Sequence, residues 1–382
     1  MENSWAHKTL GELFVFKNGL NKGKEYFGYG TPIINYMDVY KHPAIKKKYV
    51  QGRVTLSHQE LDRFRVLKGD VFFTRTSETP EEVGMSATLL EDIPNCSFSG
   101  FVLRARPLTD LLIPEYCVYA FTAKEIRASI IKNCTYTTRA LTNGRVLASL
   151  KLPIPSFSEQ QRIASALSDA DALVAELDAL IEKKRAIMAG TMQELLTGKR
   201  RLQGFSEPWV ERTIEDFAKI TTGASNTQDQ APFGIFPFYI RSASVMKSNR
   251  FLYDCEGVIT IGDGQIGKVF HYVNGKFDLH QRCYLIYDFY DVDAKFFYYI
   301  FSAFFYERAI ALSAKATVDS VRRDMIAKMK VDLPSLAEQH AIATILSDMD
   351  AEIAELEAKR DKYKEVRQGM MQQLLTGKIR LI

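Results

Sequence analysis

A glycine-rich segment at 262–267 has the spacing of a dinucleotide-binding loop. It follows a strand-like run at 257–261 and has the pattern G-x-G-x-x-G, with the residues Gly262-Asp263-Gly264-Gln265-Ile266-Gly267. In a dinucleotide-binding fold such a loop opens a helix, whose first amides bind the pyrophosphate. The residues that follow, 268–273 and then Asn274-Gly275, instead favour a second strand and a tight turn. We therefore predict a β-hairpin tip here and no cofactor on this chain.

Other patterns that would mark an enzyme are missing from the sequence. Gly198-Lys199 has no upstream glycine for a phosphate-binding loop, and there is no Asn-Pro-Pro-aromatic run, helicase motor motif or Asp…Glu-x-Lys nuclease cluster. The five cysteines are far apart without a C-x-x-C pair, and the six histidines are scattered. This usage argues against a disulfide framework and a metal site, and fits reduced thiols in the cytoplasm. We predict a chain that is not itself an enzyme.

The bulk composition is that of a soluble globular protein of at least two domains. The chain has 382 residues, of which 46% are hydrophobic and 25% charged, and single cores rarely exceed about 250–300 residues. No apolar run approaches the roughly 18 residues that a membrane span needs, and the first residues do not resemble a signal peptide. We expect no membrane contact and a cytoplasmic location. The net charge of +4 permits a nucleic-acid partner but does not require one.

An internal duplication organises the chain. The segment 155–199 matches 334–378 at a constant offset of 179 without a gap, so that Glu159-Gln160 aligns with Glu338-Gln339. A fainter match at an offset of 204 aligns Trp5 with Trp209 and Gly19 with Gly223. Between these anchors the two halves differ. The order is therefore variable block, repeated block, variable block, repeated block.

Each repeated block predicts one long amphipathic helix. Pro155 and Pro334 stand just before the helices, and Gly198 and Gly377 stand where a C-terminal cap would fall. About 38 helical residues would span roughly 57 Å. Apolar residues recur at spacings of three, four and seven, which indicates a structural packing seam between two antiparallel helices. The predicted seam consists of Ile163, Leu167, Val174, Leu177, Ile181, Ile342, Ile345, Met349, Ile353 and Leu356.

The variable blocks mix strand-like and helix-like runs. Strands are predicted near 69–73, 257–261 and 283–287, and apolar helices near 114–131 and 292–312. Short strand-like exits at 150–154 and 329–333 lead into the long helices. We predict an α+β fold with two globular domains separated by two long antiparallel helices that form a coiled coil, in a pseudo-two-fold cyclic arrangement. The predicted segments are 1–154, 155–203, 204–333 and 334–382.

This organisation resembles the specificity subunits of Type I restriction–modification systems over nearly the whole chain. The resemblance is carried by the block P-S-x-x-E-Q…L-S-D-x-D…E-L…L-L-T-G-K at 155–199 and 334–378, and by G-D-V-F-F-T-R at 69–75. In that family each globule is a target-recognition domain for half of a bipartite DNA site. The coiled coil fixes the spacing and docks two methyltransferase subunits. This chain is rather short for the family, and its second repeat stops at Ile382, which would trim possible partner contacts.

The resemblance also implies partners and cofactors. Double-stranded DNA, two methyltransferase subunits and restriction/motor subunits are the expected partners. S-adenosylmethionine, ATP and Mg²⁺ would bind those partner subunits and not this chain. Two unlike globules predict an asymmetric target, because each would recognise different bases.

Polar, basic and aromatic residues in the loops of each globule are the candidates for DNA contact. Arginine can make two hydrogen bonds to guanine, glutamine or asparagine can do so to adenine, and lysine and threonine suit phosphates. Arg75 is the strongest candidate, because the family run places it at a strand end; any one of the others can also be a solvated surface group. The first set is Lys22, Lys24, Tyr26, Arg75, Thr76, Arg139, Asn143 and Arg145. The second set is Arg241, Asp263, Gln265, Lys268, Gln281, Arg282, Lys315, Thr317 and Arg322.

Two other functions stay open at this point. The chain could be the recognition subunit of another bipartite restriction enzyme, of the Type IIB kind, whose single partner chain both cleaves and methylates. It could also be a protein-interaction scaffold that never touches DNA. Neighbouring genes distinguish the first alternative, and salt-dependent DNA binding by the reconstituted complex distinguishes the second.

Overall fold

The computed structural model describes residues 5–313 and 320–382, and it divides into two compact units. Unit 1 combines the segments 1–177 and 359–382, and unit 2 is the segment 178–358. Both units mix helices and strands, which confirms the predicted α+β class. The predicted DNA contacts Lys315 and Thr317 lie outside the described residues. Among the helices of the described ranges, none has both the length and the apolar character that a membrane span requires.

Two long helices run through both units, as the repeated blocks predict. Helix α7 (Phe157–Leu195) and helix α10 (Leu336–Leu374) have 39 residues each. Gly198 and Gly377 follow them with φ angles of +67° and +70°, and their amides donate back to the carbonyls of Leu195 and Leu374. A left-handed residue of this kind ends a helix at little cost only when it is glycine.

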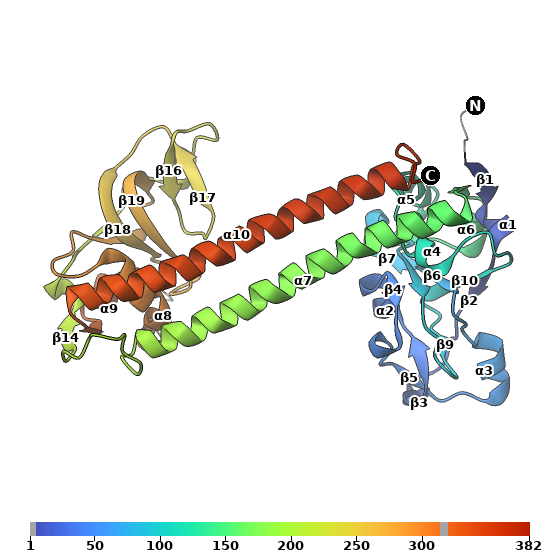
Figure 1. Cartoon of the computed structure of the whole chain (residues 1–382), viewed down its shortest axis with the longest axis horizontal. Helices are drawn as coiled ribbons and strands as arrows, with labels where there is room; N and C mark the ends of the chain where they lie inside the picture. Colours follow the sequence, from blue (N-terminus) through green and yellow to red (C-terminus); the bar gives the residue numbers. More distant parts are fainter. Residues whose placement is uncertain (1–4, 314–319) are drawn as a thin grey trace. The chain divides into compact units, whose positions relative to one another are not determined.

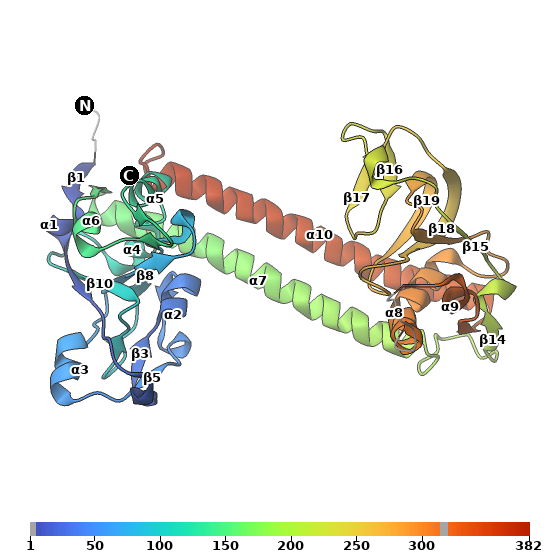
Figure 2. The same cartoon turned by 180° about the vertical axis from the view of Figure 1, so that it is seen from behind.

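The two helices pack side by side and antiparallel within each unit (Figures 1 and 2). In unit 1, Asp171 of α7 pairs with Arg367 of α10. In unit 2, Lys184 of α7 lies 2.6 Å from Glu352 of α10. The low-numbered part of one helix therefore meets the high-numbered part of the other in both units.

The ends of the long helices are built into the globular cores. Ile163 and Leu167 belong to the main core of unit 1, and Ile342 belongs to that of unit 2. Farther along, Leu177, Ile181 and Ile353 are buried, whereas Val174, Met349 and Leu356 are half-buried.

Ile345 does not fit the predicted seam, because it is 36% exposed while its neighbour Leu346 is fully buried. The buried stripe at this end of α10 is narrow and follows the four-residue step from Ile342 to Leu346. The offset of 179 aligns Leu346 with Leu167, so the duplication itself contained the correct assignment.

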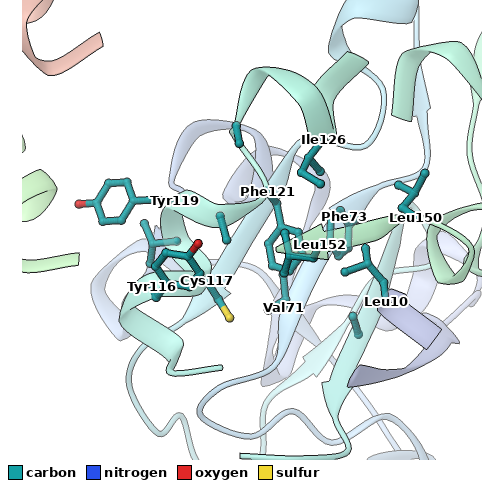
Figure 3. Close-up of a cluster of buried hydrophobic side chains, with 14 of the residues drawn as sticks. Leu10, Val71, Phe73, Tyr116, Cys117, Tyr119, Phe121, Ile126, Leu150 and Leu152 are labelled. Atoms are coloured by element: carbon teal, nitrogen blue, oxygen red, sulfur yellow. The ribbon is translucent and has the colours of Figure 1, made fainter. Parts of the chain in front are cut away.

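Unit 1 is organised around a five-stranded sheet. Its strands, in spatial order, are β2 (Phe14–Asn18), β10 (Val102–Pro107), β6 (Val71–Thr74), β8 (Ser86–Leu89) and β4 (Ala44–Ile45). One face packs on the helices α1 (Leu10–Leu13), α4 (Pro114–Ala120), α5 (Lys124–Lys132) and α6 (Gly144–Ala148). Figure 3 shows Val71 and Phe73 of the sheet among Leu10, Phe121 and Ile126 in this core.

The other face of this sheet packs on smaller elements of unit 1. Phe72 and Val102 point to this face, since neighbouring strand residues alternate in direction. The elements nearby are α2 (Tyr36–Lys41), α3 (His58–Phe64) and the sheet β5 (Arg53–Val54), β3 (Phe27–Ile34) and β9 (Ser97–Phe98). Two small sheets complete the unit: β11 (Thr135–Tyr136), β12 (Ala140–Leu141) and β7 (Thr76–Ser77), and β1 (Ala6–Thr9) with β13 (Lys151–Ile154).

Unit 2 is organised around a six-stranded sheet. The spatial order is β15 (Lys219–Thr222), β20 (Cys283–Tyr287), β18 (Tyr253–Ile261), β19 (Phe270–Leu279), β16 (Phe236–Tyr239) and β17 (Val245–Ser248). The aromatic helix α8 (Ala294–Ser313) and the short α9 (Arg323–Ala327) share its main core. A separate pair, β14 (Val210–Thr213) and β21 (Lys330–Leu333), repeats the pairing of β1 with β13 in unit 1.

Two predicted elements are corrected by the structure. The single helix predicted at 114–131 is two helices, α4 and α5. The amide and the hydroxyl of Thr122 both donate to the carbonyl of Tyr119, and this turn separates the two helices. The turn predicted at Asn274-Gly275 is also wrong. These residues lie inside β19, where eight consecutive pairs with β18 override the local turn preference. The G-x-G-x-x-G segment does form the connection of a hairpin, between β18 and β19, as predicted.

Each unit joins its two helix ends through a clamp of three residues. In unit 1, Glu159 at the start of α7 accepts two hydrogen bonds from Arg380 (2.6 and 2.8 Å) and one from Trp5 (2.9 Å). In unit 2, Glu338 at the start of α10 accepts two from Arg201 (2.7 and 2.6 Å), which lies over the ring of Trp209. Both glutamates are almost fully buried.

We expect Arg380→Ala to lower the melting temperature at pH 7 by about 5 °C, because it leaves a buried carboxylate without its cation. Hydrogen bonding from Arg380 holds the pKa of Glu159 below its ordinary value of 4.5. The stabilisation by this pair is therefore present above pH 4.5 and is lost as the pH falls through the folded pKa. Calorimetry of the unaltered chain and of Arg380→Ala between pH 7 and pH 3 measures the difference between their melting temperatures, which should become smaller in acid. Lys199→Ala, which removes an exposed cation elsewhere, is the control. An equal effect at pH 7 and pH 3 would contradict the assignment.

Candidate nucleic-acid interface

Both units bring three loops together in the same way at one end of the sheet. At the end of β6, the Arg75 amide donates to the carbonyl of Phe101 (3.2 Å), and the Arg75 carbonyl accepts from the amide of Thr142 (2.9 Å). At the end of β18, Gly262 occupies the same position. Its amide donates to the carbonyl of Arg282 (2.8 Å), and its carbonyl accepts from the amide of Val321 (2.7 Å).

The loop after the first strand of each sheet completes the arrangement. In unit 1, Leu20 forms an isolated β-bridge with Ser99, and its carbonyl accepts from the Gly100 amide (2.7 Å). In unit 2, Ser225 forms an isolated β-bridge with His280, and its backbone carbonyl accepts from the Gln281 amide (2.9 Å). We call each meeting of these segments a loop junction: 20–26, 75–76, 99–101 and 139–145 in unit 1, and 225–229, 262–268, 280–282 and 320–322 in unit 2.

Arg75 lies at the centre of the unit 1 junction. Its Nη1 donates to the carbonyl of Gly100 (2.9 Å), and among the described residues its buried Nε has no partner. Thr76 pairs with Leu141 across β7 and β12, so it is fixed beside the guanidinium. Arg139 lies in the turn between β11 and β12, 3.2 Å from Glu78, and both side chains are largely exposed.

Two other candidates of unit 1 have structural roles of their own. The Lys22 ammonium donates to Glu60 (2.7 Å) and to the carbonyl of Thr55 (3.0 Å), and lies 4.4 Å from the ring centre of Tyr26. The bond from Lys22 lowers the pKa of Glu60 to about 2. The side-chain oxygen of Asn143 accepts the first amides of α6 at 3.0 Å, as a helix cap does, so its amide nitrogen is the atom that could face DNA. Exposed candidates beside these two are Lys24, Tyr26 and Arg145.

One carboxylate of the unit 2 junction binds two arginines, one within the junction and one that follows β16. Asp263 receives Arg282 at 2.7 Å and Arg241 at 3.2 Å, and both guanidinium groups remain exposed. Partial burial alone would raise the pKa of Asp263, but the hydrogen bonds from Arg282 and Arg241 hold it below its ordinary value. An ionised Asp263 therefore fixes the direction of two cationic groups that can approach phosphate or guanine.

The remaining candidates of unit 2 lie around this group. Gln281 donates to the side chain of Asn226, and the Lys268 ammonium lies 5.1 Å from the ring centre of Tyr306. Gln265 and Arg322 are exposed. DNA contact by the described candidates of both units stays a prediction.

Two residues that hold junction side chains of unit 2 were missed at the level of sequence. Asn226 holds Gln281, and Arg250 donates to Ser225 (2.8 Å) and Asp229 (3.2 Å). Since Leu20 corresponds to Ser225, Asn226 corresponds to Asn21, and this shared asparagine is the signal that could have found it. Arg250 lies between strands with no such marker.

The cysteines offer no activated nucleophile at these junctions. Burial raises the pKa values of Cys96, Cys117 and Cys283 to about 12. A thiol with so high a pKa is protonated at neutral pH and is a poor nucleophile.

Comparisons with known proteins agree with the fold described above. A family model described as the Type I restriction modification DNA specificity domain matches residues 2–184 and 206–365. The putative type I restriction enzyme MjaX specificity subunit of Methanocaldococcus jannaschii is 26% identical, over 99% of this chain and 94% of that protein. The crystal structure of a Type-I restriction-modification system S subunit from M. genitalium has a similar fold, with a TM-score of 0.66 at 17% identity, over 98% of this chain and 97% of that one. A chain from a structural study of complex assembly and conformational transition of the type I R-M system gives a TM-score of 0.60 at 16% identity, over 99% of each.

Proposed function

The chain belongs to the specificity-subunit family of Type I restriction–modification systems, and on this premise we propose that it selects an asymmetric, bipartite site in double-stranded DNA. Each unit would recognise one half-site through its loop junction. The paired helices α7 and α10 would set the spacer between the half-sites.

The observation that carries the proposal is the pair of equivalent junctions with unlike side chains. The strand end that presents Arg75-Thr76 in unit 1 presents Gly262-Asp263 in unit 2. A palindromic site would favour like side chains at matching places, whereas these differ in charge, size and hydrogen-bonding capacity. One small reader distinguishes only a few base pairs, at about 1–3 kcal/mol each, so two readers at a fixed spacing multiply their selectivity.

The chain would act without catalysis of its own. Two methyltransferase subunits would carry out the methylation with S-adenosylmethionine, and restriction/motor subunits would use ATP and Mg²⁺. The duplicated clamps support two similar docking sites, because Glu159–Arg380 and Glu338–Arg201 give both helix starts the same local structure.

Genome-wide mapping of methylated bases tests the proposal. The host would carry this gene with its partner genes, and the control strain would lack only this gene. We expect one motif with two different halves and a fixed spacer, methylated only when the chain is present. A palindromic motif, or methylation that does not depend on the chain, would contradict it. A scaffold without DNA contact would give a reconstituted complex that shows no salt-dependent binding to a duplex carrying the site.

A further inference from the structure

A buried carboxylate lies behind the loop junction of unit 2. Asp278, near the end of β19, is 0% exposed. Its Oδ1 accepts from the hydroxyl of Ser225 (2.6 Å) and from the amide of Leu279 (2.9 Å). Its Oδ2 is also buried and accepts no hydrogen bond from the residues that the structure describes, and the Nε of Arg250 lies 3.6 Å from it. A carboxylate enclosed in this way lowers stability unless its partners compensate fully.

Folding alone does not require this carboxylate, because unit 1 builds the same backbone without it. Leu20 corresponds to Ser225, since each forms the isolated β-bridge of its unit. In the same register, Ser97 takes the place of Asp278. Unit 1 buries the apolar side chain of Leu20 in a small separate core at this point. The charged group is therefore a feature of unit 2 that the shared backbone does not explain.

Asp278 holds the first loop of the junction through Ser225 and Arg250. The Ser225 hydroxyl that donates to Asp278 also accepts from Nη2 of Arg250 (2.8 Å). The same Nη2 donates to Asp229 (3.2 Å), whose carboxylate accepts from the amide of Asn226 (2.7 Å). One network thus connects the buried carboxylate with both ends of this loop.

The same loop fixes the exposed Gln281, which is a predicted DNA contact. The backbone carbonyl of Ser225 accepts from the Gln281 amide (2.9 Å), and the side-chain oxygen of Asn226 accepts from Nε2 of Gln281. One hydrogen of Nε2 goes to Asn226, so the other hydrogen and Oε1 are the groups for the edge of a base. Two hydrogen bonds to adenine require both groups at fixed positions. A shift of the loop would move both supports of Gln281 together.

We propose that Asp278 is a positioning residue for half-site recognition by unit 2. It acts through Ser225 and Arg250 on the loop, and through the loop on Gln281. The inference rests on the proposed function and adds to it a residue that does not itself touch DNA, because its carboxylate is buried. Loss of the charge should alter the choice of bases at one half-site only, and it should leave the docking of the methyltransferase subunits unchanged.

The test measures discrimination by the complex reconstituted with its methyltransferase subunits. The probes are three fluorescent duplexes: one with the mapped site, and two in which one or the other half-site is scrambled. Discrimination at a half-site is the Kd for its scrambled duplex divided by the Kd for the intact site.

Asp278→Asn keeps the shape of the side chain but would place an NH₂ group against the guanidinium of Arg250. We expect it to lower discrimination at one half-site by about 10-fold, the effect of losing one base contact. Ser225→Ala should lower discrimination at the same half-site. The other half-site should stay within about 2-fold in both variants. Size-exclusion chromatography measures assembly, and if Asp278→Asn does not assemble, Ser225→Ala decides by the same criteria.

A double variant separates positioning from a general loss of stability. Gln281→Ala alone should lower discrimination at the same half-site, and Asp278→Asn should add less than about 2-fold to it, because both act through one contact. The matched control is Tyr299→Phe, which removes the hydrogen bond from a buried hydroxyl to Asp350 (2.6 Å). Tyr299 belongs to the main core of unit 2, whereas the neighbours of Asp278 belong to a separate one. The control should leave discrimination at both half-sites within about 2-fold.

The outcomes separate this inference from the proposed function. An unaltered complex that binds all three duplexes equally refutes the proposed function. Normal discrimination that Asp278→Asn and Ser225→Ala leave unchanged refutes the inference alone. Equal losses at both half-sites, or a loss that Asp278→Asn adds in full to that of Gln281→Ala, also overturn it, because the carboxylate would then support the fold in general. Full discrimination by Gln281→Ala overturns it as well, since Gln281 would then contact no base.

Discussion

Insertion of four residues into both long helices is expected to shift methylation to a new set of sites. The insertions would follow Leu177 in α7 and Ala358 in α10, where the chain passes from one unit to the other. Each adds one helical turn of about 6 Å, which corresponds to a spacer longer by about 1–2 base pairs. Both half-sites should stay the same, since neither junction is altered. Sequencing of methylated bases before and after the insertion measures the spacer directly.

The control for this experiment is the same insertion in α7 alone. It puts α7 out of step with α10, so that pairs such as Lys184–Glu352 can no longer form together with the clamps. We expect that variant to lose stability and methylation altogether. Continued methylation at the original spacer in the double insertion would show that the helices do not set the distance.

Arg75→Ala is expected to remove recognition of one half-site. A two-pronged contact to a base contributes about 1–3 kcal/mol of discrimination, so methylation at the mapped site should fall about 10- to 100-fold. The substitution also removes the hydrogen bond from Arg75 to the carbonyl of Gly100, and so loosens the loop 99–101 that lies between Arg75 and residues 20–26. The unit 2 half-site is the internal control, because its bases should still be required. Assembly with the methyltransferase subunits should be unchanged, and unaltered methylation of every original site would refute the role of Arg75.

The long-range plan of this fold was accessible from the sequence because it is duplicated. Prolines before the helices, glycines after them and apolar spacing between all agree: α7 and α10 begin two residues after Pro155 and Pro334 and end three residues before Gly198 and Gly377. The error at Ile345 arose from choosing by spacing alone, since three- and four-residue steps both lie near one helix face. Comparison with Leu167 would have resolved it.

The interior of the variable blocks was less accessible. The break at Thr122 depends on one local hydrogen-bonded turn, and the continuation of β19 through Gly275 depends on pairing with β18, which the sequence near Gly275 does not reveal. Side-chain partners were the least predictable part. Lys22 and Asn143 have the right chemistry for DNA, yet their partners Glu60 and the first turn of α6 are set by the tertiary fold and the local cap geometry.

The arrangement of unit 1 from two separate segments has a consequence for synthesis on the ribosome. Leu374 and Leu375 belong to its core, and Arg380 closes its clamp, so the unit cannot be completed until the last segment has been made. Unit 2 is continuous from 178 to 358 and can form earlier. Domains usually mature from the N-terminus onward as the chain emerges. Here the first-made half has to wait for a segment that begins at residue 359, 182 codons after residue 177.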